Sequence, residues 1–399
     1  MTSENLKNTD PNVKDANPDN SSHVVMADSV QAEVIPTIPI ESLETINALQ
    51  PEVSVHSVAS TEDVSAPAPL VVQPAEYHRT FKEWLQIWKD GVRLHYLPLG
   101  LMPLLVGSVL AWMPTVSPQN PLGRFHFLHI IAAIIALVLL QMGANLANDY
   151  HDYLRGVDTS NALGPGGLIQ QGLIKPTRVL LFGLGLLGLG AVVGLIISLT
   201  DGPLLLLFGL VTLLCAYFYS ATTRALSTIA LGELASFLVF GPILTIGAYM
   251  LQSGGSMSSL ALLYSLPFGC LAAATIHANN MRDAEDDQHA HKHTLANLLG
   301  VRWSRALYSL LLVVSYAVIV ALAVPHGTPH LILITLWTLP EAVIAFTGAL
   351  RTVSPAALHL VMRQTLQIET AFAILLIIAL IITTLFPVLP LIPAKILPV

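Results

Sequence analysis

Acidic side chains gather in two short stretches, each at the end of a long apolar run. The first stretch is NDYHDYLRGVD, which contains Asp149, Asp152 and Asp158. The second is NNMRDAEDDQHAHKHT, which contains Asp283, Glu285, Asp286 and Asp287. Carboxylate and amide oxygens are the ligands that Mg²⁺ prefers, together with waters and substrate phosphates. If the two stretches face each other, they could hold Mg²⁺ ions that bridge to a diphosphate.

The spacing within each stretch is that of one face of a helix. The apolar run that precedes the first stretch could continue as a helix past residue 147. The positions i, i+3, i+4 and i+7 would then form one stripe of Asn145, Asn148, Asp149 and Asp152. The positions i, i+4 and i+8 form a second stripe of Asn279, Asp283 and Asp287. Each stripe lies at a helix C-terminus, where the negative end of the helix dipole adds to the carboxylates. Such a site needs cations.

The elements that position these stripes are apolar segments long enough to cross a bilayer, whose hydrocarbon core is about 30 Å thick. Nine such segments are predicted, at 96–114, 127–147, 178–199, 203–221, 229–251, 259–279, 303–324, 330–350 and 367–388. The sequence therefore predicts an all-α, polytopic membrane protein. The stripes follow the second and sixth segments, which run in the same direction, so both stripes should emerge on one side of the membrane.

The distribution of Lys and Arg in the short loops predicts which side that is. Thirteen basic residues flank the segments on one side, whereas only Arg124 and Lys395 lie on the other. Because cytoplasmic loops carry the excess of Lys and Arg, the N-terminus and both acidic stretches are predicted to be cytoplasmic. Trp84 and Trp88 precede the first segment and suit an amphipathic helix at the membrane surface. We expect the protein to lie in the cell membrane.

Composition separates this membrane portion from the N-terminal residues. Only 11% of the 399 residues are charged and 54% are hydrophobic, against about 25% charged in soluble proteins. Residues 1–80 hold 12 of the 25 acidic residues and show no helical period, so a disordered acidic tail is expected there. This tail lacks the features of a signal peptide. We expect residues 81–399 to form the transmembrane domain.

Basic residues near the two stretches suit the oxygens of a diphosphate. They are Arg155, Lys175, Arg282 and Lys292. The positive-inside rule alone would also place Lys or Arg in these loops, so each residue has both interpretations. Arg282 lies inside the second motif itself.

The two motifs resemble those of the UbiA-type family of intramembrane aromatic prenyltransferases, over nearly all of 90–300. The family's first motif corresponds to Asn148, Asp149 and Asp152, followed by Asp158, and the second corresponds to Asp283 and Asp287. Within the family, the sequence is most similar to the 1,4-dihydroxy-2-naphthoate polyprenyltransferases of menaquinone synthesis. The stretches that carry this likeness are ANLANDYHDYLRGVD, GPGGLIQQGLI, LGELASFLVFGPILTIGAYMLQ, NNMRDAEDD and HTLANLLG.

The resemblance implies nine transmembrane helices around a central cavity, with cytoplasmic loops 2–3 and 6–7 as a cap. It also implies the reaction. Bound Mg²⁺ would draw diphosphate from a polyprenyl diphosphate, and the aromatic ring would attack the allylic cation and lose its carboxyl group as CO₂. On this analogy the Mg²⁺–diphosphate residues are Asn148, Asp149, Asp152, Asp283 and Asp287. Further substrate contacts or supporting residues would be Asn145, Asp158, Asn279, Arg155, Lys175, Arg282, Lys292 and Arg224.

Two places depart from the family pattern. After the fourth segment the chain reads YFYSATTRALS where related sequences often carry Gly and Pro, although Arg224 could still match a basic residue there. His293 stands where a second basic residue commonly precedes Thr-Leu-Ala. Both changes leave the metal ligands intact and bear on the acceptor and diphosphate contacts.

Other functions fit the residues less well. A divalent-cation transporter predicts acids near the bilayer midplane in broken helices, and the core motif of a CDP-alcohol phosphotransferase is absent. Relatives that use 4-hydroxybenzoate, homogentisate or haem as acceptor stay open, as does the oligomeric state. The expected partners are a polyprenyl diphosphate, an aromatic acid and membrane lipid, without nucleic acid.

Overall fold

The structure is a computed structural model that describes residues 80–113, 116, 125–156, 167–219, 225–324 and 329–386. All of them belong to the unit Glu76–Val399. The expected disordered tail, Asp158 and Arg224 lie outside the described residues, apart from Thr80.

Helices make up nearly all of the described chain, as the sequence predicts. They are α1 Phe81–Gly91, α2 Pro98–Leu110, α3 Phe127–Arg155, α4 Pro176–Asp201, α5 Pro203–Phe218, α6 Gly232–Leu238, α7 Leu244–Ser253, α8 Ser259–Arg282, α9 Ala284–His289, α10 Leu295–Ala323, α11 Leu339–Arg351 and α12 Pro355–Leu385. A π-helical turn, Val239–Ile243, joins α6 to α7, and a 3₁₀ segment, His330–Thr338, precedes α11. Within the described ranges, β pairing is limited to an isolated bridge between Ile229 and His293.

Seven helical segments of the described chain are long and apolar enough to cross a membrane, and an eighth is counted if α1 and α2 are taken as one bent span. The bend between that pair is 42°. Helix α5 is apolar but has only 16 residues, which is shorter than the roughly 20 that a span needs. The predicted count of nine therefore stays a prediction, whereas the all-helical membrane architecture is confirmed.

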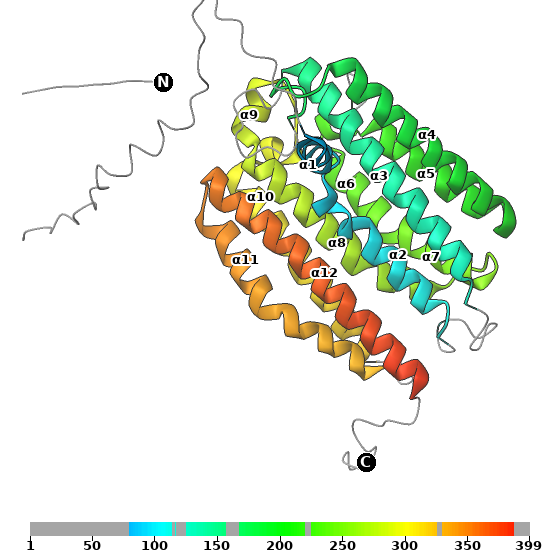
Figure 1. Ribbon diagram of the computed structural model, residues 1–399. Helices are drawn as coiled ribbons and strands as arrows, with labels where there is room; N and C mark the ends of the chain where they lie inside the picture. The colour runs from blue at the N-terminus through cyan, green and yellow to red at the C-terminus, as the bar shows by residue number, and fades with distance from the viewer. Residues whose placement is uncertain are drawn as a thin grey trace, which may run out of the picture. The chain divides into compact units, whose positions relative to one another are not determined.

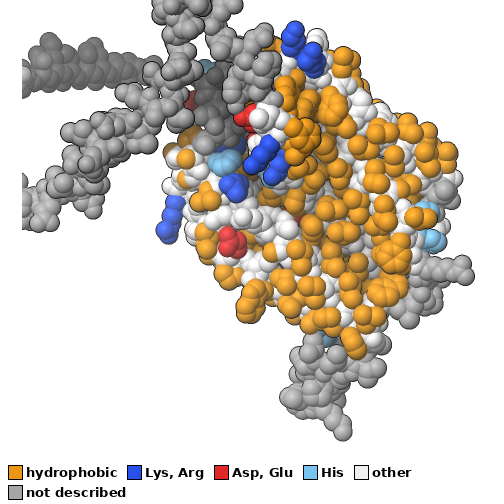
Figure 2. Space-filling model, viewed as in Figure 1, with side chains coloured by type: hydrophobic (Ala, Val, Ile, Leu, Met, Phe, Trp, Pro, Cys, Tyr) orange, Lys and Arg blue, Asp and Glu red, His pale blue; other side chains and the backbone are white. Residues whose placement is uncertain are grey.

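The helices lie roughly side by side (Figure 1). Helix α3 packs along α4, and α8 packs against α6, α10 and α12. The interior of the bundle is aromatic as well as aliphatic, since Phe372 meets both Phe268 and Tyr316 edge to face. Figure 2 shows hydrophobic side chains over most of the visible face, with Lys, Arg, Asp and Glu gathered toward one end.

Close backbone approach brings the wall of the functional site together. Gly241, in the π-helical turn, lies so near α8 that a Cβ there would be 2.7 Å from Gly269 Cα. Small residues allow membrane helices to pack at this distance. The turn follows from Pro242, which cannot donate the backbone hydrogen bond of a regular helix.

The N-terminal helix α1 fits the predicted amphipathic surface helix. Thr80 and Glu83 form a capping box at its start, so its first turn satisfies its own backbone donors. Its apolar side meets a small cluster in which Trp88 packs against buried residues that include Val92 and Leu168. Because Leu168 follows α3 in the chain, α1 packs on the described part of the connection between α3 and α4, which starts at residue 167.

Candidate active site

The predicted extension of the second apolar segment is confirmed. Helix α3 continues to Arg155 and ends at Gly156, whose φ of 70° is the left-handed conformation that glycine adopts at low cost. The four residues of the first stripe therefore lie on one continuous helix, in its last three turns.

The second stripe is not one continuous helix. Helix α8 ends at Arg282, and Asp283 links it to the short helix α9 with φ −92° and ψ 6°. Two backbone hydrogen bonds still keep the i to i+4 spacing, from Asp283 N to Asn279 O and from Asp287 N to Asp283 O. Asp287 consequently belongs to α9 and not to the end of α8.

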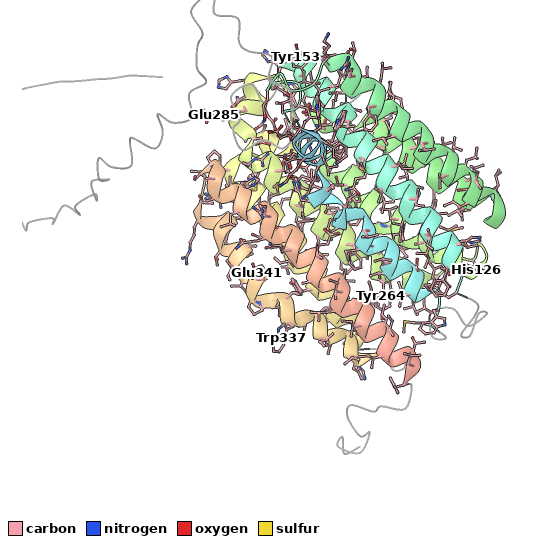
Figure 3. All side chains as sticks on the ribbon, viewed as in Figure 1. His126, Tyr153, Tyr264, Glu285, Trp337 and Glu341 are labelled. Carbon is pink, nitrogen blue, oxygen red and sulfur yellow. The ribbon has the colours of Figure 1, made fainter. Side chains whose placement is uncertain are left out.

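A cavity lies between these helix ends and is lined by residues from α2, α3, α5, α6, α8 and the loops beside them. Of the predicted residues it is lined by Asn145, Asn148, Asp152, Asn279, Asp283 and Lys292. The structure thus brings the two motifs to one space although they are more than 120 residues apart. Figure 3 shows Tyr153 and Glu285 toward one end of the bundle, with His126 at the other, so both motifs lie at the same end.

The remaining walls of the cavity are mostly apolar. They include Leu99, Leu137, Leu140, Val239 and Phe240. Away from the carboxylates the cavity is therefore suited to a hydrocarbon chain, and at the motifs it is suited to a charged group.

Two of the predicted aspartates are buried beside the cavity and do not line it. Asp149 is 2% exposed, and its Oδ1 accepts a hydrogen bond of 3.0 Å from the backbone N–H of Gly167. Asp287 is 1% exposed. Asp149 Oδ2 and Asp287 Oδ2 are buried without a hydrogen-bond partner in the part of the chain that the structure describes.

The predicted basic residues take different positions. Arg155 Nη1 lies 3.1 Å from Oδ1 of Asp152, which is one turn earlier on α3. Arg282 is buried and bonds Asp283 through Nε and Nη2, both at 2.6 Å, so its guanidinium group supports the motif instead of lining the cavity. Lys175 is exposed at the start of α4 and does not line the cavity either.

Lys292 combines both positions, because it lines the cavity and reaches the buried Asp287. Its Nζ lies 3.0 Å from Asp287 Oδ1. Burial raises the pKa of Asp287 to about 7, although Lys292 opposes this. Burial alone would lower the pKa of Lys292, but the nearby acidic groups, chiefly the Asp287 and Asp152 carboxylates, together outweigh burial and raise this pKa above its usual value. When no cation is bound at the motif, the ammonium group of Lys292 supplies the positive charge beside Asp287.

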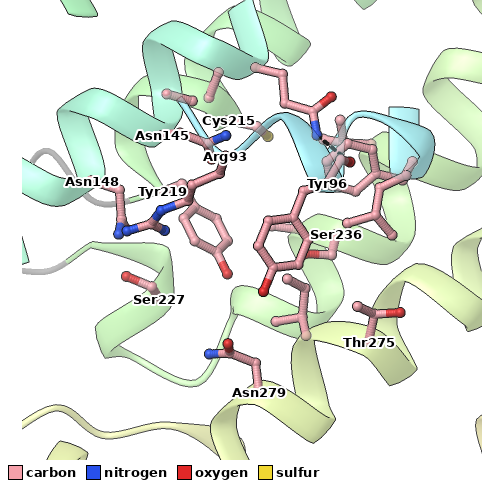
Figure 4. A pocket seen from close by; sticks show the side chains of 18 of the residues that line it. Arg93, Tyr96, Asn145, Asn148, Cys215, Tyr219, Ser227, Ser236, Thr275 and Asn279 are labelled. Atoms are coloured by element: carbon pink, nitrogen blue, oxygen red, sulfur yellow. Dashed lines mark hydrogen bonds between the residues drawn. The ribbon is translucent and has the colours of Figure 1, made fainter. Parts of the chain in front are cut away.

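Several residues that line the cavity belong to no sequence motif, so the sequence did not identify them as part of the site. Arg93, Tyr96 and Tyr219 line the same space, and Figure 4 shows the two tyrosine hydroxyls pointing into it toward Asn279. Arg93 lies between α1 and α2 with φ 57°, a backbone conformation that is uncommon for a side-chain-bearing residue. An unusual conformation of this kind cannot be recognised from residue types alone.

Two buried glutamates also belong to the spans. Behind the cavity wall, Glu233 Oε1 accepts a hydrogen bond from Asn280 and lies 2.9 Å from His277 Nδ1. Glu369, in the middle of α12, is fully buried, and neither of its carboxylate oxygens has a hydrogen-bond partner in the described chain. Glu369 does not line the cavity. It lies in the predicted membrane-spanning segment 367–388, and the sequence indicated nothing further about it.

The donor set of the two motifs fits Mg²⁺. Among the described residues, no three His, Cys, Asp or Glu side chains converge to hold a metal by themselves. Mg²⁺ does not need such a cage, because it takes one or two carboxylates and completes its shell with water and phosphate. Asp152 and Asp283 present carboxylates to the cavity, and the unpartnered oxygens of Asp149 and Asp287 lie behind them.

Comparison with known proteins decides the family. The model of the UbiA prenyltransferase family matches residues 100–358. This chain belongs to the UbiA prenyltransferase family. Its membership makes it a membrane-embedded prenyltransferase, as the two motifs predict.

Curated relatives agree with this assignment. The chain is 28% identical over 298 residues to the 1,4-dihydroxy-2-naphthoate octaprenyltransferase of Bacillus subtilis, covering 75% of this chain and 93% of the relative. It is 32% identical over 253 residues to the Haemophilus influenzae protein of the same name, covering 62% and 80%. A UbiA prenyltransferase domain-containing protein 1 homolog of Drosophila melanogaster is 30% identical over 299 residues, covering 74% and 79%.

Solved structures show the same fold. The UbiA homolog from Aeropyrum pernix has a TM-score of 0.53 at 16% identity, covering 73% of this chain and 98% of that one. The UbiA homolog from Archaeoglobus fulgidus, bound to DMAPP and Mg²⁺, has a TM-score of 0.51 at 16% identity, with the same coverage.

Proposed function

We propose that this prenyltransferase transfers a polyprenyl group from polyprenyl diphosphate to 1,4-dihydroxy-2-naphthoate and yields demethylmenaquinol, diphosphate and CO₂. The proposal rests on one observation: the two Asp-rich motifs lie at the polar end of the same cavity, and the walls beyond them are apolar. The names of the curated relatives support the choice of donor and acceptor.

The polar end binds the diphosphate in this proposal. Asp149, Asp152, Asp283 and Asp287 hold Mg²⁺, with Asn148 beside them. Bound Mg²⁺ supplies positive charge that offsets the repulsion between the carboxylates and the diphosphate. Lys292 contributes a second positive charge from the cavity wall.

The apolar walls take the first isoprene units and keep water away from the reacting carbon. The C–O bond of the donor breaks and its electron pair leaves with the diphosphate. The ring of the acceptor supplies the electron pair for the new C–C bond. The carboxylate on that ring carbon then leaves as CO₂, and the electron pair of the broken C–C bond restores the aromatic system. Water would capture the allylic cation, so its exclusion by Leu99, Leu137 and Phe240 protects the product.

The test uses membranes that contain the protein, a labelled prenyl diphosphate and one aromatic acid at a time. The naphthoate, labelled in its carboxyl group, should give a prenylated product and release labelled CO₂ in equal amounts. A product from 4-hydroxybenzoate, homogentisate or haem, but not from the naphthoate, would overturn the acceptor assignment.

The prediction that the motifs face the cytoplasm is tested by labelling a cysteine placed at Glu285 from either side of sealed vesicles.

A further inference from the structure

A buried hydrogen-bond network stands directly behind one wall of the cavity. Glu233, at the start of α6, is 5% exposed. Its Oε1 accepts a hydrogen bond of 2.9 Å from Asn280 Nδ2 and lies 2.9 Å from His277 Nδ1. Of these three residues, only Asn280 lines the cavity. Glu233 bonds Asn280 from behind the wall, and His277 bonds Glu233 in turn.

The partners of His277 determine how many protons the network holds. Its Nε2 lies 3.1 Å from the backbone carbonyl of Ser304, which can only accept, so Nε2 carries a hydrogen. A neutral ring then has a lone pair at Nδ1, which would face the Glu233 oxygen. A hydrogen bond between these two atoms needs one more proton, on either His277 or Glu233. The pair is net neutral in both cases, which suits its burial inside a membrane protein.

This network fixes which way the Asn280 amide points. The Glu233 oxygen accepts from the NH₂ group, and a flipped amide would place two acceptor oxygens against each other. The amide oxygen of Asn280 is therefore left for the cavity. At this position the ligand must therefore offer a hydrogen-bond donor and not an acceptor.

The position of Asn280 along α8 indicates which ligand that is. Asp283 lies about one turn further along α8, at the polar end, and Ile276 lies about one turn back, at the apolar wall. Asn280 therefore stands between the place for the diphosphate and the place for the hydrocarbon chain. The reacting carbon of the donor and the ring of the acceptor must meet there.

We propose that Asn280 is a specificity-determining residue, whose amide oxygen accepts a hydrogen bond from a ring hydroxyl of the aromatic acceptor, and that Glu233 and His277 are positioning residues that hold this amide in place. The inference rests on the proposed function, since it assumes a hydroxylated aromatic acceptor. A hydroxyl group that donates to Asn280 releases electron density into the ring and makes the ring a better nucleophile. Asn280 itself takes no proton.

Steady-state kinetics of the full-length protein in lipid nanodiscs, with each substrate varied in turn, test this assignment. Asn280→Ala should raise KM for the aromatic acceptor about tenfold, the scale of one lost hydrogen bond, and leave KM for the prenyl diphosphate within about twofold. Gln288→Ala, which removes an exposed amide from α9, is the control and should change neither. An equal rise in both KM values, or none in the acceptor KM, would overturn the assignment.

Two further comparisons separate recognition from a structural effect. With acceptor analogues that each lack one ring hydroxyl, the penalty of Asn280→Ala should disappear for one analogue; a penalty that persists for every analogue would contradict the inference. Glu233→Ala should show the same acceptor-specific change and add nothing to Asn280→Ala, whereas Glu233→Gln should recover part of it. Additive effects would show that Glu233 does not act through Asn280.

The proposed function can fail separately. If the wild-type protein prenylates a different hydroxylated acid, the kinetics are carried out with that acceptor and the assignment of Asn280 is still tested. If the wild-type protein prenylates no aromatic acid, the proposed function is wrong, and the Asn280 assignment is wrong with it.

Discussion

Arg282 bonds both carboxylate oxygens of its neighbour Asp283, from Nε to Oδ1 and from Nη2 to Oδ2, each at 2.6 Å. The same guanidinium group reaches α12, where Nη1 lies 2.9 Å from His359 Nδ1. A buried arginine thus ties the second motif to the C-terminal helix and fixes how Asp283 faces the cavity. The planar fork of arginine is required for this arrangement, because the ammonium group of lysine cannot bind two oxygens in parallel.

Arg282→Lys should therefore lower kcat/KM about tenfold to a hundredfold, although the charge is kept. The loss should appear as a higher Mg²⁺ concentration at half-maximal activity, because Asp283 is no longer held in place. Arg351→Lys, at the exposed end of α11, is the matched control and should behave as wild type. An Arg282→Lys protein with an unchanged Mg²⁺ requirement would contradict this role.

Lys292→Met should weaken both stability and diphosphate binding. Removal of Lys292 leaves the buried Asp287 without its cation, and breaking a buried pair costs about 3 kcal/mol. The midpoint of thermal unfolding in detergent should fall without Mg²⁺ and recover in part when Mg²⁺ is added. Lys89→Met on the exposed side of α1 is the control. Equal midpoints for Lys292→Met and wild type in EDTA would argue against the pair.

Gly241→Ala should destabilise the wall of the cavity. A Cβ at this position would lie 2.7 Å from Gly269 Cα and must push the π-helical turn away from α8. Overpacking of this kind costs about 1 to 3 kcal/mol. Gly185→Ala is the control, because a Cβ at Gly185 meets no atom within 4 Å. A thermal midpoint for Gly241→Ala equal to that of Gly185→Ala would show that the two segments do not pack this closely.

Glu369→Leu should leave activity within about twofold and raise the thermal midpoint. Both oxygens of Glu369 are buried without a hydrogen-bond partner in the described chain, so an apolar side chain of similar size removes a penalty of about 1 kcal/mol or more. Thermal unfolding and initial rates measure the two effects. A large loss of activity in a stably folded Glu369→Leu protein would reveal a function for this carboxyl group.

The sequence alone predicted the family, the helical membrane fold and the shared location of the motifs, because these depend on local patterns. Apolar length predicted most spans, and the i, i+3, i+4 and i+7 spacing predicted that α3 continues past residue 147. The break of the second stripe at Asp283 was missed, since the spacing of Asn279, Asp283 and Asp287 survives a kink that keeps its backbone hydrogen bonds.

Contacts between distant segments could not be predicted in the same way. The sequence left two interpretations open for Arg282, and it could not show the contact with His359, which is 77 residues away and carries no motif. Arg93 and Tyr96 line the cavity from a junction between helices, where no periodic pattern applies. Asn280 is the same residue type as its neighbour Asn279, and only the structure shows that Asn279 bonds Asp283 and Arg282 whereas Asn280 bonds Glu233.

We propose that Asp152 on α3 and Asp283 after α8 belong to one Mg²⁺–diphosphate site. It is tested most directly by Mg²⁺-dependent binding of a labelled prenyl diphosphate to the purified protein. EDTA should abolish binding and added Mg²⁺ should restore it. Asp152→Asn and Asp283→Asn should each cause a large loss of binding, with little further loss in the double variant. Glu285→Gln, on the exposed side of α9, should bind as wild type. Binding that survives EDTA, or that survives either Asp variant, would show that the two aspartates do not share a Mg²⁺–diphosphate site.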